Sequence, residues 1–583
     1  MNSSTARKNP YIIGRPIYET EKFFGRESLF EFIKDNLNNN IKILLLHGQR
    51  RIGTSSVLKQ FYHKLAQDKF VFVTFDLQGY SQSHLSDILH NLAQEITEKV
   101  SENLNLNSAI IPLPSEEELN KNPEIFSANF LPNVYHKLGD KNLVLLLDEF
   151  DVVSSDDSII NQGSSFFIYL QSLLKQQEKL FIIPVVGRTK NDLQNLLDLF
   201  KCPPSQEVSL LDEISAKRLI TKPAQGMLEY EEDAIEAILE LSSGHPYFIQ
   251  ANCFNIFLQA KIEDKWKVTR SDVEGIVDKT IESVTSGLAW FWDGLSIDEK
   301  VVFSAVAEAQ KKSFIEDWLT LLKKYGVIQT EELIQAKKQL VDKDYLDDSD
   351  DIKCRVKIEL VRLWIIESHP LQKTIRELEE LRKQEINIIN EEAIKLYDNG
   401  KIQDTIDCYE NILKLNPNHF STLPILADRY LEIDNFDNAL KVYQRAYQID
   451  YIRNKEGFLL ALEAYGNNLI KQREFIKAKV QFEEVLKIEP DRESAKYKLR
   501  EIEAEIEQQQ KLDRKAQLSQ AQIYQQKLEI ESLNRKNHIS QRVILGIIVV
   551  IISLVGIILL YRFSNSCDKG QQKVNGACVD NRN

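Results

Sequence analysis

Five short, mainly apolar runs in the first 210 residues constrain the fold more than any other feature of the sequence. Each run is four to six residues long, and stretches with helical periodicity separate one run from the next. Strands that are buried on both faces, as in parallel sheets, show such runs. Their alternation with helices is typical of an α/β sheet covered by helices on both faces. The predicted strands are 41–46, 70–75, 143–147, 181–186 and 207–210.

The first run ends at a loop that contains two glycines, Gly48 and Gly53, and a helical stretch follows the loop. The backbone N–H groups of such a loop can surround phosphate groups, and the N-terminus of the following helix favours negative charge. The glycine pair alone is weak evidence, because many loops match it. A phosphate-binding loop normally continues with lysine, but Thr54 occupies that position and Ser55 follows it. The loop therefore predicts a nucleotide site that lacks one cation.

Two carboxylates, Asp148 and Glu149, directly follow the third apolar run. Carboxylates at the end of a buried strand cost free energy unless they have a role. In the functional interpretation, Asp148 holds Mg²⁺ through water and Glu149 activates the attacking water. The alternative is a solvated strand end. Arg188 follows the fourth run, where a nucleotide sensor would lie beside the phosphate site of an open sheet; a structural arginine is the alternative.

Several motifs in this order resemble those of the AAA-like, STAND-type P-loop ATPases: NPYIIGRPI with FFGRE, LLLHGQRRIG, LVLLLDEFD, VVGRTKNDL and SSGHPYFIQ. The resemblance extends from residue 9 to 370 and includes LSIDEKVVF and RVKIELVRLWI, which are similar to parts of a winged-helix module. It implies a P-loop NTPase sheet of the ASCE/RecA-like type, an all-helical lid and a winged helix. The cofactors it implies are ATP or ADP with Mg²⁺.

The resemblance also implies roles for residues at matching positions. Pro246 would pack on the adenine and His245 could approach a phosphate, although a histidine that only begins a helix fits the chemistry equally well. Mg²⁺ would be held by Ser55 and Asp148, and catalysis would use Glu149 and Arg188. The residues expected to hold the nucleotide are Gly48, Gln49, Arg50, Arg51, Ile52, Gly53, Thr54, Ser55, Ser56, His245 and Pro246.

The lysine that Thr54 replaces normally neutralises oxygens of the β- and γ-phosphates, and its charge matters most in the transition state. The backbone of the loop and the hydroxyl of Ser55 are retained. We therefore predict nucleotide binding with poor or absent hydrolysis, and whether the protein is an enzyme stays open. The alternatives are an active ATP-hydrolysing switch and a winged-helix regulator that binds DNA.

Charge disfavours a nucleic-acid partner. The chain has a net charge of −14, whereas binding to DNA phosphates needs an excess of Lys and Arg. Residues 296–366 carry 14 Asp and Glu against 12 Lys and Arg, and the expected wing at 347–351 reads DDSDD. We expect the winged helix to serve as a packing or regulatory module.

Residues 389–498 contain a repeat with the helix-turn-helix pattern of tetratricopeptide repeats. The segment 399–418 aligns with 433–451 at an offset of 34 residues, and 471–491 follows at an offset of about 39. Stacked helix pairs of this kind expose a concave surface on which a protein or peptide partner can bind. Alternatively, the repeats only stack on the ATPase module and transmit its state.

The C-terminal region predicts a membrane anchor. A charged helix, 499–540, has a poor heptad pattern for a coiled coil, and the run 543–561 then contains no charged residue in 19 positions. Basic residues flank the run on both sides, so charge alone leaves the topology open. Because nucleotide is cytosolic and Cys567 and Cys578 suit a disulfide, we expect a cytoplasmic bulk and an extracytoplasmic tail. Two unpaired thiols are the alternative.

Taken together, these features predict a single-pass, membrane-anchored signalling or scaffolding protein with a degenerate nucleotide module, and homo-oligomerisation is left open. The expected domains are the nucleotide-binding core 1–210, the helical lid 211–285, the winged helix 286–370, a connecting helix 371–388, the repeats 389–498, the charged helix 499–540, the span 543–561 and the tail 562–583.

Overall fold

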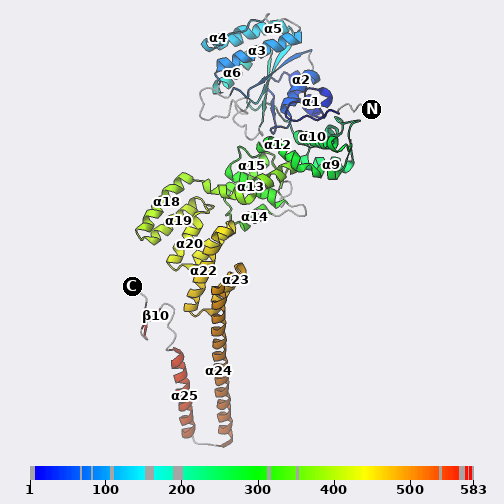
Figure 1. Ribbon diagram of the computed structural model, residues 1–583. Helices are drawn as coiled ribbons and strands as arrows, with labels where there is room; N and C mark the ends of the chain where they lie inside the picture. Colours follow the sequence, from blue (N-terminus) through cyan, green and yellow to red (C-terminus); the bar gives the residue numbers. More distant parts are fainter. Residues whose placement is uncertain are drawn as a thin grey trace. The chain divides into compact units, whose positions relative to one another are not determined.

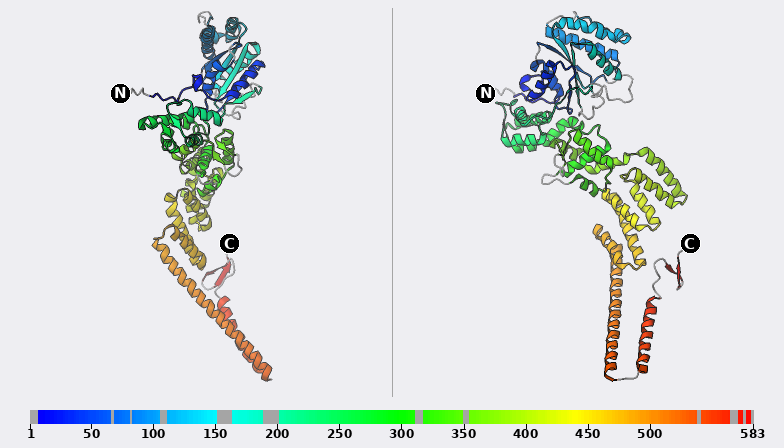
Figure 2. Two further views of the ribbon diagram at one scale, coloured as in Figure 1. Left: turned by 90° about the vertical axis from the view of Figure 1, so that its right-hand side faces the viewer. Right: turned by 180° about the vertical axis from the view of Figure 1, so that it is seen from behind.

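The computed structural model divides into two compact units, Met1–Lys455 and Glu456–Asn583 (Figures 1 and 2). The residues that the structure describes are 7–65, 68–80, 83–104, 111–150, 163–187, 201–310, 317–348, 354–537, 541–563, 571–574 and 577–580.

A five-stranded parallel sheet forms the first part of the chain, as the apolar runs predict. Its order is β2-β3-β4-β1-β5, and every neighbouring pair is parallel. The first strand is shorter than expected, and the fifth comes earlier in the chain than 207–210. The strands are β1 (Leu45–His47), β2 (Phe70–Asp76), β3 (Asn142–Asp148), β4 (Leu180–Val186) and β5 (Ser205–Glu207).

Helices cover both faces of this sheet, because successive side chains of each strand point to opposite sides. In β3, Leu143, Leu145 and Leu147 pack into the core beneath α3, α5 and α6, whereas Val144 and Leu146 pack beneath α1 and α2 (Figure 1). The carboxyl ends of the strands therefore meet at one edge. The helices are α1 (Glu27–Asn38), α2 (Thr54–Lys64), α3 (Leu85–Leu104), α4 (Glu116–Lys121), α5 (Leu131–Leu138) and α6 (Gly163–Gln176).

The segment after the sheet is mainly helical, but the prediction of helices alone is wrong. Two short strands, β6 (Glu229–Tyr230) and β7 (Lys267–Val268), pair in parallel between helices. Two residues each are too few to produce a periodic signal in the sequence. The helices are α8 (Glu213–Thr221), α9 (Glu232–Ser242), α10 (Pro246–Glu263), α11 (Arg270–Gly275) and α12 (Val277–Ala289).

Four helices and an antiparallel strand pair follow. Ser296 begins the first helix with a capping box, because its side chain accepts from the N–H of Glu299. The elements are α13 (Ile297–Ala309), α14 (Trp318–Lys324), α15 (Glu331–Asp342), β8 (Leu346–Asp347), β9 (Arg355–Val356) and α16 (Glu359–Ser368).

The single connecting helix predicted for 371–388 is wrong. Helix α17 (Leu371–Ile375) continues as a 3₁₀ turn, η7 (Arg376–Glu380), and the chain then breaks at Arg382, whose φ is +59°. A left-handed residue cannot continue a right-handed helix, so α18 (Lys383–Asp398) starts anew. The residues at this point are mainly charged and have good helix propensity, so nothing in the sequence predicts that a helix ends here.

Helix pairs follow with the predicted repeat. Gly400, Asp434 and Arg473 adopt positive φ of +72°, +57° and +64° between the two helices of successive pairs, at spacings of 34 and 39 residues. The extra residues lengthen α22, which has 21 residues where α20 has 11. The helices are α19 (Ile402–Leu415), α20 (Thr422–Glu432), α21 (Phe436–Ile449), α22 (Tyr451–Lys471) and α23 (Phe475–Ile488).

Two long helices dominate the rest of the second unit. The expected charged helix is present as α24 (Glu493–Asn537), and α25 (Gln541–Phe563) covers the uncharged run. Within the described parts of the chain, no helix combines the length and the apolar character needed to cross a membrane. The span expected at 543–561 is therefore not supported here. Strands β10 (Gln571–Val574) and β11 (Ala577–Asp580) pair after it; Cys567 lies outside the described residues, so the disulfide stays a prediction.

Candidate functional site

The two glycines shape the loop, residues 48–53, that leads from β1 into α2. Gly53 has a φ of +100° and directly precedes the first residue of α2, so only a residue without Cβ takes this turn without strain. A Cβ on Gly48 would lie 2.7 Å from the carbonyl oxygen of Val208, which excludes any larger residue there. The loop therefore leads into the N-terminus of α2 with its backbone uncovered by side chains at Gly48 and Gly53, as in a phosphate-binding loop.

Ser55 and Asp148 meet at the edge of the sheet. The Ser55 hydroxyl donates to Oδ2 of Asp148 at 2.9 Å, and Asp148 is buried with 8% of its surface exposed. Burial raises the pKa of the Asp148 carboxyl, and the charge of Asp76 on β2 adds to this, whereas the hydrogen bond from Ser55 lowers it. Two oxygen ligands suit Mg²⁺, which keeps several waters and phosphate oxygens as its other ligands. Among the described residues no group of three or more His, Cys, Asp or Glu forms a metal site by itself.

Glu149 lies beside Arg50 of the loop. Their side chains approach to 3.6 Å between Nη2 and Oε2. The guanidinium of Arg50 also lies 4.0 Å from the centre of the Trp290 ring, just beyond the end of α12. Arg188, the predicted sensor, lies outside the described residues, so its placement stays a prediction.

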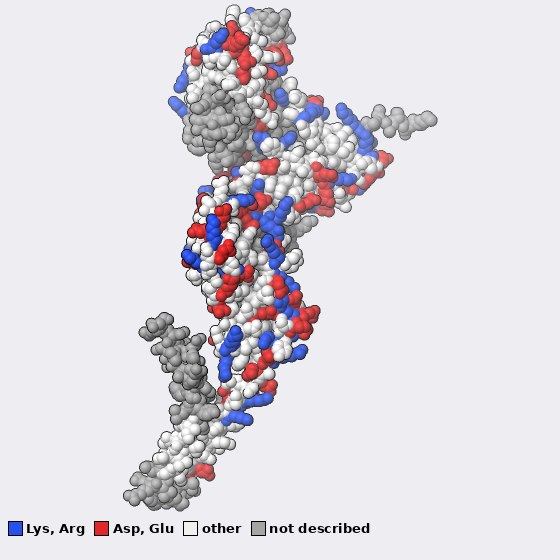
Figure 3. Space-filling view, turned by 60° about the vertical axis from the view of Figure 1, so that its left-hand side comes forward, with Lys and Arg blue, Asp and Glu red and all other residues white. Residues whose placement is uncertain are grey.

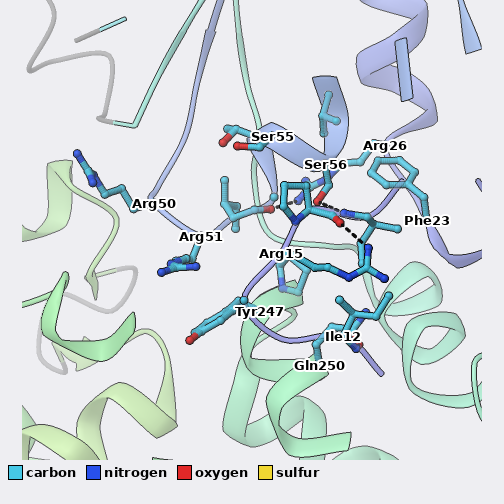
Figure 4. A pocket seen from close by; sticks show the side chains of 18 of the residues that line it. Ile12, Arg15, Phe23, Arg26, Arg50, Arg51, Ser55, Ser56, Tyr247 and Gln250 are labelled. Carbon is cyan, nitrogen blue, oxygen red and sulfur yellow. Dashed lines mark hydrogen bonds between the residues drawn. The ribbon is translucent and has the colours of Figure 1, made fainter. Parts of the chain in front are cut away.

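The neighbouring loop residues also reach other elements. The guanidinium of Arg51 lies 5.5 Å from the centre of the Tyr247 ring on α10 (Figure 4). The Gln49 amide donates to the carbonyl oxygens of Lys343 and Asp344, at 3.2 Å and 2.9 Å, in the turn between α15 and β8. Gln49 thus links the loop to the turn between α15 and β8 and does not line the cavity described below.

An N-terminal segment, residues 9–18, crosses the site, which the sequence did not indicate. The Ile17 N–H donates to the Ser56 hydroxyl at 3.0 Å, and the Gln60 amide donates to the Ile17 carbonyl at 3.2 Å. Farther along, the Ile12 N–H donates to the Gln250 side chain at 3.0 Å. Ser56, expected to hold nucleotide, therefore holds this segment, which joins α2 to α10.

A cavity of about 340 Å³ opens between the loop, this segment and α10. Arg50, Ile52, Gly53, Thr54, Ser55, Ser56 and Pro246 line it, as do Asp148 and Glu149. Its described lining carries five cations and only two carboxylates, in a chain with a net charge of −14. The five basic residues are Arg15, Lys22, Arg26, Arg50 and Arg51.

Arg26 is half-buried directly before the first residue of α1. It donates to the carbonyls of Ile52 at 3.3 Å and Leu210 at 3.5 Å, which ties α1 to the loop. Burial lowers the pKa of Arg26 to about 10, and the charges of Asp212 and Glu207 oppose that shift. The guanidinium therefore stays charged at neutral pH and contributes to a positive field in the cavity.

His245 does not line the cavity, so the expectation that it approaches a phosphate is wrong. It is fully buried and lies immediately before α10, with its ring 4.7 Å from Phe248 and 6.3 Å from Phe291, centre to centre. Burial lowers its pKa to about 3, with a further contribution from Arg26, so the ring is neutral. The alternative of a histidine that begins a helix is the correct one.

No protein-family model and no curated protein sequence matches the chain. Among solved structures, the chain is similar to a Walker-type ATPase of Pyrococcus abyssi, with 16% identity and a TM-score of 0.44 over 60% of this chain and 98% of that one. It is also similar to the ORC2 protein of Aeropyrum pernix in its ADPNP and ADP complexes, with 12% identity and a TM-score of 0.39 over 61% and 96%. A shorter match, with 23% identity and a TM-score of 0.17 over 21% and 94%, is the first TPR of Spaghetti (RPAP3) bound to an HSP90 peptide. At these identities the likeness concerns the fold alone.

Proposed function

We propose that the cavity binds ATP or ADP with Mg²⁺, and that the protein acts as a nucleotide-responsive switch with slow or absent hydrolysis. The observation that carries this proposal is the cluster of five cations around a glycine loop, in a strongly acidic chain. A di- or triphosphate is the small anion that matches such a cluster together with a helix N-terminus.

Each part of the site has a role in this proposal. The loop N–H groups and the N-terminus of α2 would hold the phosphates, and Ser55 and Asp148 would hold Mg²⁺ when it is bound. Pro246 and Tyr247 of α10 would contact the base side of the ligand, because they line the cavity from a helix outside the sheet. Thr54 offers a hydroxyl where a lysine would offer a charge, which weakens stabilisation of the transition state more than binding.

Calorimetric titration of the full chain tests binding. We expect both ATP and ADP to bind, and Mg²⁺ to strengthen the binding of ATP. Asp148→Asn should remove this effect of Mg²⁺, whereas Asp76→Asn, on the neighbouring strand, should retain most of it. Absence of binding by either nucleotide at millimolar concentration would refute the proposed function.

Asp148→Asn should also stabilise the protein in the absence of Mg²⁺, by about 1 kcal/mol at most. Because burial raises the pKa of Asp148, its carboxylate destabilises the fold at pH values above that pKa. The amide can keep both hydrogen bonds of the carboxyl group. Its oxygen still accepts from the Glu149 N–H, and the Ser55 hydroxyl can turn and accept from its NH₂ group. The gain should be present at pH 7 and disappear as the pH falls through the raised pKa of Asp148. Thermal unfolding with a chelator at several pH values measures it, and a gain that grows toward acid would contradict it.

We propose that the repeats carry the signal to a protein partner. Helix α15 supports this, because the loop residue Gln49 holds the turn at its C-terminal end and the repeats hold the loop before its N-terminal end. There, Asn418 both donates to the carbonyl and accepts from the N–H of Ile328, at 3.0 Å and 2.8 Å. A helix of 12 residues spans about 18 Å. It therefore gives a continuous mechanical path between the nucleotide site and the repeats.

The second alternative, a DNA-binding regulator, has less support. Lys337 of α15 pairs with Asp348 and Lys343 pairs with Glu299, so two of the basic side chains in this region already have acidic partners. On the face shown in Figure 3, basic and acidic side chains are interspersed. Tight retention on DNA at low ionic strength would favour the regulator.

We also propose that residues 543–561 attach the protein to a membrane, with the bulk of the chain cytoplasmic and the tail outside. Large apolar side chains on several sides of α25 support an apolar surrounding, among them Val550 at 58% exposure and Ile552 at 63%. Labelling of Cys567 and Cys578 with an impermeant thiol reagent on intact cells, after reduction, tests the topology. A tail labelled only after the cells are opened would contradict this proposal.

A further inference from the structure

Three consecutive side chains of the glycine loop each contact a different element outside the sheet. Gln49 binds the turn after α15, Arg50 lies on Trp290 after α12, and Arg51 lies near Tyr247 on α10. A loop that only cradled phosphate would need no such contacts. Any movement of these side chains on ligand binding would therefore change the contacts of the loop with the lid and with the winged helix.

Arg50 is the one of the three that also contacts the proposed catalytic carboxylate. Its guanidinium lies between Glu149, at 3.6 Å, and the Trp290 ring, at 4.0 Å. The side chains of Arg50 and Glu149 are 30% and 26% exposed, so the pair is weak and can be exchanged for a stronger anion. Gly187 leaves room for this arrangement, since a Cβ there would lie 3.2 Å from Cγ of Arg50.

In this arrangement Arg50 extends away from Ser55, although it lines the same cavity (Figure 4). One of the two arginines in the loop, close in sequence to the position of the missing lysine, is thus directed at Glu149 and Trp290. A terminal phosphate carries more negative charge than one carboxylate and offers the geometry that a guanidinium binds with two parallel hydrogen bonds.

We propose that Arg50 is a phosphate-responsive latch. Without a triphosphate, Arg50 holds Glu149 and Trp290; when a nucleoside triphosphate binds, its terminal phosphate binds Arg50 instead, which ends the contacts of Arg50 with Glu149 and Trp290. This inference rests on the proposed function and adds its regulation: the latch distinguishes triphosphate from diphosphate, and Trp290 carries the difference to the lid. Arg50 is a positioning residue for Glu149 in the first state and a ligand of the phosphate in the second.

Tryptophan fluorescence of the full chain tests the latch, because cation contact and release change the emission of Trp290. The chain has five tryptophans, so the Trp290 signal is the difference between the wild type and Trp290→Phe. With Mg²⁺ present, a non-hydrolysable ATP analogue should change this signal at saturation, and saturating ADP should leave it unchanged. Calorimetry on the same samples records whether each nucleotide is bound.

Two variants sharpen the test. Arg50→Gln should abolish the Trp290 signal. It should lower the affinity for the triphosphate analogue about tenfold and the affinity for ADP by less than about threefold, because only the terminal phosphate loses a charged partner. Glu149→Gln removes the competing carboxylate and should strengthen binding of the analogue. Arg218→Gln is the matched control, since its guanidinium also lies over an aromatic ring, 5.6 Å from the centre of Phe24, but does not line the cavity, and it should preserve the difference between the two nucleotides.

Equal Trp290 signals with both nucleotides, or a signal that persists in Arg50→Gln, would overturn the latch while leaving nucleotide binding intact. A lower affinity of Glu149→Gln for the analogue would also contradict the latch. If calorimetry finds that neither nucleotide binds, the proposed function itself fails, and the latch fails with it.

Discussion

Replacing Thr54 by lysine should raise the rate of ATP hydrolysis by about a hundredfold. Removing one charge-stabilising donor from an active site typically costs a factor of about 10²–10³, and the substitution restores such a donor. The remaining parts of the site are in place, since Ser55 contacts Asp148 at 2.9 Å and Thr54 begins α2 and lines the cavity. Phosphate release by the purified full chain, with saturating ATP and Mg²⁺, measures the rate.

Thr54→Met is the matched control, because it lengthens the side chain by a similar amount without adding a charge. We expect it to leave hydrolysis at the wild-type level, and we expect ATP affinity to rise in Thr54→Lys only. Wild-type turnover that already equals that of Thr54→Lys would show that the cations around the cavity replace the lysine. The protein would then be an active ATPase.

Much of the sheet could be predicted, because burial on both faces leaves a direct record in the sequence. Residues 143–147 are fully buried and contain no polar residue, so the strand and the two carboxylates after it are visible together. The glycine loop is visible for a similar reason, since Gly53 at a φ of +100° marks the turn into α2. Local sequence determines these features, and the structure agrees with them.

The partners of the loop side chains could not be predicted, because they depend on contacts between distant parts of the chain. Gln49 meets Asp344 across 295 positions, and Ile12 meets Gln250 across 238. Nothing near Gln49 in the sequence distinguishes a side chain that binds a phosphate from one that binds a carbonyl. The position of His245 could not be predicted for a related reason. A residue between Gly and Pro can begin a helix with its ring toward the phosphate site or toward the core, and only the packing against Phe248 and Phe291 decides between the two.

Arg445→Met should loosen the attachment of the repeats to the loop between α14 and α15 by about 3 kcal/mol, the second large effect that we expect. Arg445 lies on α21 and donates to the carbonyls of Gly326 at 2.7 Å and Pro417 at 2.5 Å, and to the side chain of Asn418 at 2.9 Å. Burial lowers its pKa to about 10, so it remains charged at neutral pH. Methionine fills similar volume but leaves the carbonyl oxygens of Gly326 and Pro417 without the Arg445 donor, at about 1–3 kcal/mol each in a buried site, whereas Oδ1 of Asn418 still accepts from the Ile328 N–H.

Hydrogen exchange of peptides that cover 326–330 measures this loosening, because Ile328 donates its N–H to the Asn418 side chain that Arg445 holds. Exchange should become about a hundredfold faster, the equivalent of about 3 kcal/mol in local opening. Exposed Arg453, at the start of α22, provides the matched control, and Arg453→Met should change exchange little. Unchanged exchange in Arg445→Met would mean that apolar packing alone holds this junction. If the loosened variant still binds nucleotide but no longer changes protection in the repeats when it does so, then α15 is the route by which the site acts on them.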